Sequence, residues 1–396
     1  MTATAPTFTS ARVRAPDEVA GAFDTGAFKC SNSSSLARAL VLLKWTFTFT
    51  SVYHVPRGLA TALLLFGAMG SMSCEQSLDP RSRALTGVEA YLDAELEVLR
   101  GAVEDLAAAA PAPDDDGWNA REDAAAVTEM KAAWRRVRAS YERIEGALGH
   151  LFPSIAHSAD GRYEAFIEEA ADVNLFDGEG VTGMHAVERV LWADAHSPAV
   201  IAFESALPGY APAAFPSDEA AARAFRDELV GRLAGDVAAM QESFGPLALD
   251  PATAFRGVTE SVEEQVEKVD LPGPGEDESR YAGATLDDMR ANLEGGREIY
   301  EEFRPWLVQQ GEGPAVDAAV VAGFDRIAAV YDSMPGTALP EVPETWNSAS
   351  PTTADLGTPY GQLVTGLARE SDPDDDGSLI SAMNRAADAL RIPRAR

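Results

Sequence analysis

A histidine and a glutamate, His185 and Glu188, lie three positions apart in the apolar segment GVTGMHAVERVLW, residues 180–192. Side chains three positions apart share one face of an α-helix, so this pair can contact the same ligand. Each of the two follows an apolar core position, Met184 or Val187, by one residue, which places the pair at the edge of the buried face. An imidazole and a carboxylate in that position are typical ligands of a transition-metal ion.

A second polar pair repeats this arrangement earlier in the chain. In the segment YERIEG, Glu142 and Glu145 each follow a residue of an apolar stripe by one position. Helical bundles form metal sites from inward carboxylates and imidazoles on facing helices. Three carboxylates and one neutral imidazole suit iron, manganese, zinc or copper(II) better than magnesium or calcium. The same spacing also fits a wet helix face on which the two glutamates pair with Arg138 or Arg143.

Apolar residues at helical spacing predict the elements that must carry these side chains. Residues 84–108 and 121–150 each contain a stripe of apolar residues three or four positions apart. Further helices are predicted over residues 161–172, 181–195, 217–245, 252–268, 284–310, 315–334, 360–370 and 378–391, with a loop rich in Pro, Ser and Thr at 335–358. Alternating strand patterns are almost absent. The sequence therefore predicts an all-α fold of one or two antiparallel bundles.

The charge of the chain is strongly negative. It has 63 Asp and Glu against 32 Lys and Arg, and its formal net charge is −31. Such a surface repels phosphate backbones and anionic membrane faces, so we expect no nucleic-acid binding. It attracts cations, although most acidic proteins need the charge only for solubility. The two cysteines, Cys30 and Cys74, exclude a disulfide scaffold and a thiolate zinc cluster.

Cys74 follows a short apolar segment that looks like a bacterial lipoprotein signal. The segment RGLATALLLFGAMGSMSC has one arginine, about a dozen apolar or small residues, and small residues up to the cysteine. Its apolar run is too short for a comfortable membrane span. We expect residues 1–73 to be a leader and signal peptide, Cys74 to carry the lipid, residues 74–83 to form a linker, and residues 84–396 to form the helical domain. A cleaved signal without lipid and an anchor helix are the alternatives.

Three motifs in the same order resemble the imelysin-like family, which includes M75-type peptidases and EfeO-type periplasmic iron-uptake proteins. TGMHAVE looks like the family's GxHxxE motif, and YERIEG is similar to YERIEP in its EfeO branch. SRYAGATLDDMRANLEGGREIYEEFRPWL is similar to a later segment of that branch. The resemblance covers roughly residues 84–334 and implies a pair of helical bundles with a metal site between helices. Gly146 stands where the branch has a proline, and no β-rich segment is present to form the cupredoxin domain of many members.

The resemblance also implies the ligands and the role of this site. The implied metal ligands are His185, Glu188, Glu142, Glu145, Asp160 in the intervening loop, and Glu263 and Glu264 on a later helix. The implied metal is iron, as Fe²⁺ or Fe³⁺, or in some members copper or zinc. The expected protein is a lipid-anchored metal carrier of the bacterial periplasm or cell envelope, which delivers iron to an EfeU-type inner-membrane permease.

Two other functions fit the same residues. A zinc peptidase of the HExxH type needs a glutamate between two histidines, but Ala186 and Arg189 occupy the corresponding positions. Other histidines, His150, His157 and His196, are near enough in sequence to contribute. A surface lipoprotein that binds a partner without any metal is the second alternative. Metal carriage is favoured because the chain offers several carboxylates beside one histidine.

One acidic segment resembles a calcium loop at its start. DPDDDG, residues 372–377, has acids and a glycine at the first positions of such a loop, but Met383 stands where a bidentate glutamate is required. We expect an acidic turn that caps the final helix.

Overall fold

The computed structural model describes residues 78–119, 121–161, 182–207, 210–269 and 278–394. Within these ranges the chain forms helices and no strand, which confirms the all-α prediction. The described elements are α2 (Pro80–Ala108), α3 (Ala124–Leu148), α4 (Pro153–Asp160), α5 (Gly183–Leu191), α6 (Pro198–Glu204), α7 (Glu219–Arg223), the π-helix η2 (Ala224–Val230), α8 (Gly231–Phe244), α9 (Pro251–Glu267), α10 (Thr285–Leu307), α11 (Gly313–Asp332), α12 (Thr353–Leu356), α13 (Pro359–Ser371) and α14 (Leu379–Leu390). Helices α4 and α6 were not predicted, nor was the short α12, which lies in the segment 335–358 expected to be a loop. The helix expected over 161–172 falls almost wholly outside the described residues.

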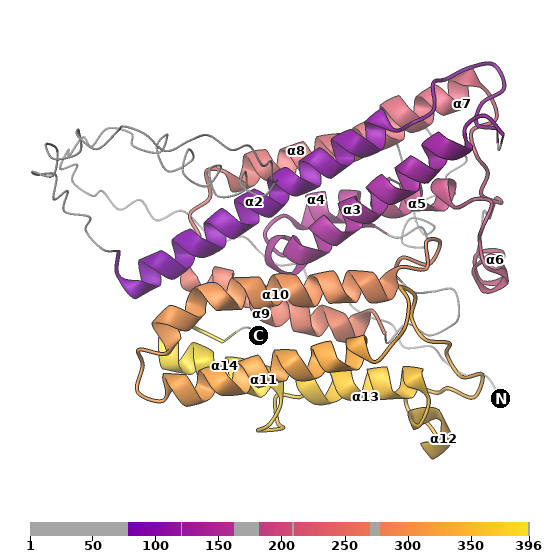
Figure 1. Cartoon of the computed structure of the whole chain (residues 1–396). Helices are drawn as coiled ribbons and strands as arrows, with labels where there is room; N and C mark the ends of the chain where they lie inside the picture. The colour runs from indigo at the N-terminus through magenta and orange to yellow at the C-terminus, as the bar shows by residue number, and fades with distance from the viewer. Residues whose placement is uncertain (1–77, 120, 162–181, 208–209, 270–277, 395–396) are drawn as a thin grey trace, which may run out of the picture. The chain divides into compact units, whose positions relative to one another are not determined.

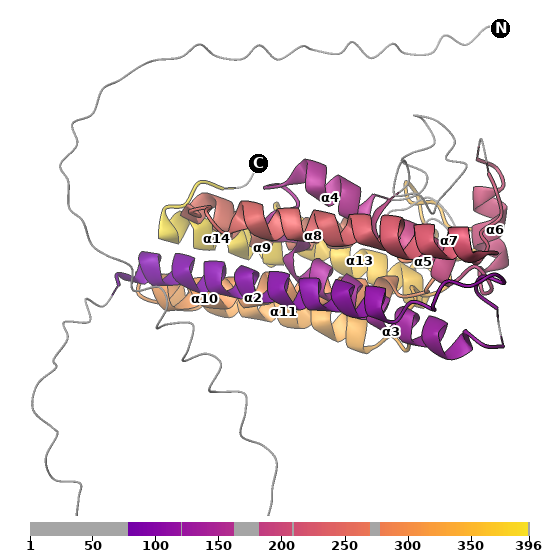
Figure 2. The ribbon, with the colours of Figure 1, turned by 90° about the horizontal axis from the view of Figure 1, so that it is seen from above.

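The helices are arranged in layers (Figure 1). Helix α2 packs on α3 and α8, while α11, α13 and α14 pack on one another on the other side. Helices α9 and α10 lie between these groups and contact both of them. Seen from above in Figure 2, the axes of α2, α8, α10 and α11 run in nearly the same direction, whereas Figure 1 shows α2 and α8 inclined to α10 and α11. The fold is therefore two helical bundles that share their central pair of helices.

Helix starts and apolar stripes explain why these segments are helical. The Asp79 side chain accepts hydrogen bonds from the backbone N–H groups of Arg81 and Ser82 at 3.1 and 3.2 Å, which caps α2 at Pro80. The predicted stripes are buried as expected. They consist of Val88, Leu92, Leu96, Leu99, Val103 and Leu106 in α2, and of Val127, Met130, Trp134, Val137, Tyr141, Ile144 and Leu148 in α3.

Two glycines allow α3, α9 and α10 to approach one another closely. A Cβ atom on Gly146 of α3 would lie 2.7 Å from the backbone nitrogen of Ser261 in α9. A Cβ atom on Gly295 of α10 would overlap the backbone of Arg143 in α3. Since only glycine leaves room for such contacts, these positions fix how near the helices come. Polar side chains on the three helices are thereby enclosed in one buried layer.

The N-terminal features predicted from the sequence fall outside this description. Residues 1–77, including Cys74 and the expected signal segment, are not among the described residues. Among the helices that are described, none has the length and hydropathy needed to cross a membrane.

Candidate metal centre

The HxxE motif lies on α5, whose first turn is held against the end of α4. Gly183, the first residue of α5, has a φ of +84°, and a Cβ atom there would lie 2.5 Å from a backbone oxygen of α4. Glycine adopts this backbone conformation without strain. Thr182 donates from its hydroxyl to the carbonyl of Ser158 at 3.2 Å. This junction places His185 next to Asp160, which is the last residue of α4 and not a loop residue as predicted.

Both ring nitrogens of the buried His185 lie near carboxylates. Nδ1 lies 3.0 Å from Oε2 of Glu188, to which a proton on Nδ1 is donated. Nε2 lies 3.3 Å from Oδ1 of Asp160 and 3.4 Å from Oε1 of Glu278. Neither contact has the geometry of a hydrogen bond, and Nε2 has no hydrogen-bond partner in the described part of the chain. Nε2 is therefore a buried nitrogen that faces two carboxylates without being satisfied by either.

Both carboxylate oxygens of Glu188 accept hydrogen bonds. Oε1 accepts hydrogen bonds from the backbone N–H groups of Tyr281 and Ala282 at 3.0 and 2.8 Å, and Oε2 accepts from His185. A carboxylate that bonds the far nitrogen of a histidine fixes the ring's orientation and tautomer, as it does behind metal-bound histidines. Glu188 therefore orients His185, and it also fixes the segment that carries Glu278.

Asp160, His185 and Glu278 have the spacing of metal ligands. One carboxylate oxygen from each acid and a ring nitrogen of the histidine all lie within 4.8 Å of one another. Tetrahedral ligands about 2.1 Å from a metal ion are roughly 3.4 Å apart. The separations of 3.3 and 3.4 Å between Nε2 and the two carboxylates match that value.

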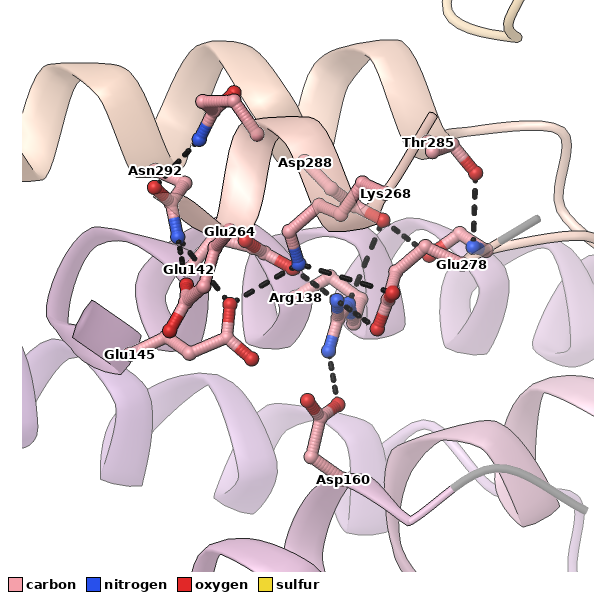
Figure 3. Close-up of polar contacts among 12 residues, drawn as sticks. Arg138, Glu142, Glu145, Asp160, Glu264, Lys268, Glu278, Thr285, Asp288 and Asn292 are labelled. Carbon is pink, nitrogen blue, oxygen red and sulfur yellow. Dashed lines mark hydrogen bonds and ion pairs between the residues drawn. The ribbon is translucent and has the colours of Figure 1, made fainter. Parts of the chain in front are cut away.

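Arg138 on α3 connects these acids to one of the YERIE glutamates (Figure 3). Its guanidinium donates to Asp160 and to Glu142, and it lies 3.4 Å from Glu278 and 3.6 Å from Asp288. The pairing of Glu142 with Arg138 that the sequence left open is present, but on a buried face and not a wet one. Arg138 therefore joins Asp160, Glu142, Glu278 and Asp288 into one polar network.

Lys268, the residue that follows the last turn of α9, holds both YERIE glutamates. Its Nζ lies 3.0 Å from Oε1 of Glu142, 3.0 Å from Oε2 of Glu145 and 3.9 Å from Oε2 of Glu278. Figure 3 shows the ammonium group between these side chains. Glu142 and Glu145 are therefore held by a lysine, whereas the HxxE histidine faces Asp160 and Glu278.

The two acids predicted on α9 lie in different surroundings. Glu264 accepts a hydrogen bond from Asn292 at 2.7 Å, and the same amide group donates to Glu145 at 3.2 Å. Glu263 is exposed, and its charged neighbours all lie on α9 itself. The structure thus brings six of the seven predicted ligands into one polar network and leaves Glu263 outside it.

Burial shifts three carboxyl groups of the network toward their protonated forms, and it holds the pKa of Glu264 well above its usual value. Desolvation raises the pKa of Glu142 to about 7 and that of Asp288 to about 8, although Arg138 acts in the opposite direction on both. These groups therefore share protons with their surroundings near neutral pH, which reduces the cost of placing so many acids in one buried layer.

His185 and Glu278 are shifted toward their charged forms. Burial acts to lower the pKa of His185, but Asp160, Glu188 and Glu278 outweigh it and hold that pKa well above its usual value. Burial acts to raise the pKa of Glu278, but Lys268 and His185 outweigh it and hold that pKa well below its usual value. The carboxylates around His185 thus favour a positive charge on the ring, in the place where they would neutralise a metal cation in the same way.

The other features singled out in the sequence lie apart from this group. His150 contacts the carbonyl of Gly146 at 3.2 Å, and His196 contacts the carbonyl of Arg189 at 3.0 Å. His157 is exposed. The three histidines are therefore not part of the ligand group formed by the described residues.

The DPDDDG segment forms the turn between α13 and α14. Ser378, which follows it directly, caps α14 by accepting a hydrogen bond from Ser381, and its hydroxyl donates to the carbonyl of Asp372 at 2.6 Å. The predicted capping role thus belongs to the serine after the acidic residues and not to an aspartate.

Glu278, Arg138 and Lys268 were not predicted to be part of the site. Glu278 lies in a turn without helical periodicity, directly before the SRYAG motif, and the run of acids in GEDES was the available signal. Arg138 follows an apolar stripe residue by one position, as Glu142 does, so the rule applied to the glutamates also fits the arginine. Lys268 lies four positions after Glu264 and thus on the same face.

Comparisons with known proteins agree with the motifs. A family model described as imelysin, or peptidase M75, matches residues 84–362. The iron uptake system component EfeO of Escherichia coli (strain K12) is 28% identical over 213 residues, which make up 53% of this chain and 46% of that protein. EfeO of Shigella flexneri matches to the same extent, so the chain spans about half the length of these curated relatives. An imelysin-like protein from Psychrobacter arcticum 273-4 matches over 77% of this chain and 93% of its own, with a TM-score of 0.41 and 11% identity.

Proposed function

Because the chain belongs to the imelysin family, whose model matches residues 84–362, we propose that it binds iron as cargo for a bacterial uptake system. The name of its curated relatives, iron uptake system component, supports iron as the cargo. The chain spans 46% of such a relative, so the name of the relative alone does not assign a role in uptake. The ligand group of the site is the second support for that role.

The observation that best supports iron binding is the ligand group of Asp160, His185 and Glu278. Two carboxylates and one imidazole are ligands that suit iron, and also manganese, zinc and copper(II). The free position of His185 Nε2 faces both acids, and Glu188 holds the opposite nitrogen. In this proposal the first three residues bind the ion, and Glu188 orients the histidine.

The remaining acids of the network surround this site. Glu142 and Glu145 are held by Lys268 at 3.0 Å, and Glu264 is held by Asn292 at 2.7 Å. We assign these three acids to the polar surroundings of the ion and not to its direct coordination.

The geometry of Glu188 supports carriage over hydrolysis. A catalytic zinc ion needs an open coordination position and a nearby general base for its water. Glu188 is the candidate base within the HxxE motif, but its two oxygens accept three hydrogen bonds from His185, Tyr281 and Ala282. A carboxylate engaged in this way serves orientation.

The envelope location and the partner belong to the same proposal. The segment before Cys74 looks like a lipoprotein signal, so the mature chain would be lipid-anchored in the periplasm or cell envelope and would pass iron to an inner-membrane permease. Intact-mass spectrometry of the membrane fraction tests the anchor. The lipid should be present at Cys74 and absent from the Cys74→Ser protein, and a mature chain that starts elsewhere would refute it.

The binding site is tested by equilibrium dialysis of the purified protein with Fe²⁺ under argon. Asp160→Asn, His185→Gln and Glu278→Gln should each weaken binding by about 10-fold or more, since each removes one ligand atom. Glu263→Gln is the matched control, because Glu263 is an exposed acid outside the network, and it should bind as the parent does. Circular dichroism checks that the helices are retained. Iron binding by His185→Gln that equals the parent's would place the site elsewhere.

A further inference from the structure

Besides the guanidinium group of Arg138, the buried network contains two positions at which carboxylates surround a nitrogen group. At the first, His185 faces Asp160 and Glu278. At the second, the ammonium group of Lys268 faces Glu142 and Glu145. The lysine is 4% exposed, so water does not compensate its charge and the carboxylates must do so.

Glu278 connects the two positions. Its Oε1 lies 3.4 Å from His185 Nε2, and its Oε2 lies 3.9 Å from Lys268 Nζ. A carboxylate that offers one oxygen to each of two cations is the arrangement found between paired metal ions in proteins. In this chain the cation at the second position is the ammonium group of Lys268, which is part of the protein itself.

The second position also has an unused ligand atom. Oε1 of Glu142 accepts from both Arg138 and Lys268, whereas its Oε2 is buried and has no hydrogen-bond partner among the described residues. Glu142 itself is 1% exposed. A fully buried carboxylate oxygen without a donor is costly, and a metal ion in the place of the ammonium group would relieve that cost.

We propose that Lys268 acts as a built-in substitute for a second metal ion and limits the protein to one ion per chain. The ammonium group neutralises Glu142 and Glu145 and so keeps them from competing for the cargo held by Asp160, His185 and Glu278. Removal of its charge opens a second cation site, formed by Glu142, Glu145 and Glu278, for a divalent transition metal. This inference rests on the proposed function only for the site that contains His185.

The test is the number of zinc ions bound per chain, measured by elemental analysis of the purified protein after dialysis at an ionic strength of about 0.15 M, which suppresses binding to surface carboxylates. The parent should bind one ion and Lys268→Met two, while Lys268→Arg, which keeps the charge, should bind one. Lys131→Met is the matched control, since Lys131 is paired with Asp194 at 3.2 Å outside the network, and it should also bind one. One ion in Lys268→Met, bound with the parent's affinity, would overturn the inference.

A second variant tests the same inference with the charge of Lys268 retained. Glu145→Gln, with Lys268 retained, should bind iron within about threefold of the parent, because the lysine and not the ion holds this glutamate. A loss of 10-fold or more would show that iron displaces the lysine, which overturns the inference. A parent that binds no iron would refute the proposed function alone, because the second ion gained by Lys268→Met does not require it.

Discussion

At the scale of single residues, the site depends on the different tasks of His185 and Glu188. Glu188 accepts from Nδ1 at 3.0 Å, and the opposite nitrogen is left to face Asp160 and Glu278. These three carboxylates also raise the pKa of His185 well above its usual value, against the effect of burial. A metal ion must therefore displace a proton that is held more tightly than on a free imidazole.

This proton competition predicts a pH-dependent affinity. Because the surrounding carboxylates raise the pKa of His185, protons compete with the metal for the ring at a higher pH than on a free imidazole, and binding should weaken by up to about tenfold per pH unit between about pH 8 and about pH 6. Glu142, with a pKa of about 7, and Asp288, with a pKa of about 8, gain protons in the same range and add to the loss. Isothermal titration with zinc, which has no redox chemistry, measures the effect.

A variant at Glu188 separates this explanation from a general effect of acid. Glu188→Gln removes one of the carboxylates that raise the pKa of His185, so the decline should move to lower pH while binding at high pH weakens by about 10-fold or more. A zinc affinity of the parent that is constant over the range, or a decline at the same pH in both proteins, would contradict the role of His185.

At the scale of elements, helical periodicity predicted most of what surrounds the site. Glu142 and Glu145, each one position after an apolar stripe residue of α3, enter the network as expected, and Arg138 has the same placement. On α10, Asp288 and Asn292 are four positions apart and both are buried. Periodicity works here because each helix turns a fixed polar edge toward its neighbours.

The other residues of the site are positioned by turns and junctions, which have no helical periodicity. Glu278 lies in a turn next to Pro- and Gly-rich sequence, and it reaches His185 because two backbone N–H groups of the same segment bond to Glu188. Asp160 reaches it through the α4–α5 junction, which contains the positive φ of Gly183. Such contacts between distant segments cannot be read from local spacing.

The junction gives a prediction at this scale. Gly183→Ala adds a methyl group 2.5 Å from the backbone of α4 at a φ of +84°, and this strain should cost about 1 to 3 kcal/mol of unfolding free energy. Because the strain moves His185 away from Asp160, iron affinity should fall by about 10-fold as well. Urea unfolding and iron dialysis measure the two effects.

Another glycine provides the control. Gly235 on α8 is exposed, and a Cβ atom there would meet nothing within 4 Å. Gly235→Ala should raise stability by up to about 1 kcal/mol, since alanine is the better helix former, and should leave iron binding unchanged. Parent-like stability and affinity in Gly183→Ala would show that the junction does not position the histidine.

At the scale of the whole molecule, the acidic charge complicates any count of bound metal. A formal net charge of −31 attracts cations to exposed carboxylates throughout the surface. Such binding is screened by salt, whereas binding in the buried network is screened much less. The position of the ion in the buried network therefore distinguishes the cargo site from surface binding.

The most direct test locates the ion. Crystals of the iron-loaded protein, grown at an ionic strength near 0.15 M to suppress surface binding, give an anomalous difference map at the iron absorption edge. We predict one strong peak within coordination distance of His185 Nε2 and of carboxylate oxygens from Asp160 and Glu278, with Lys268 still paired to Glu142 and Glu145. A peak between Glu142 and Glu145 without contact to His185, or no peak in the buried network, would contradict the assignment of this site.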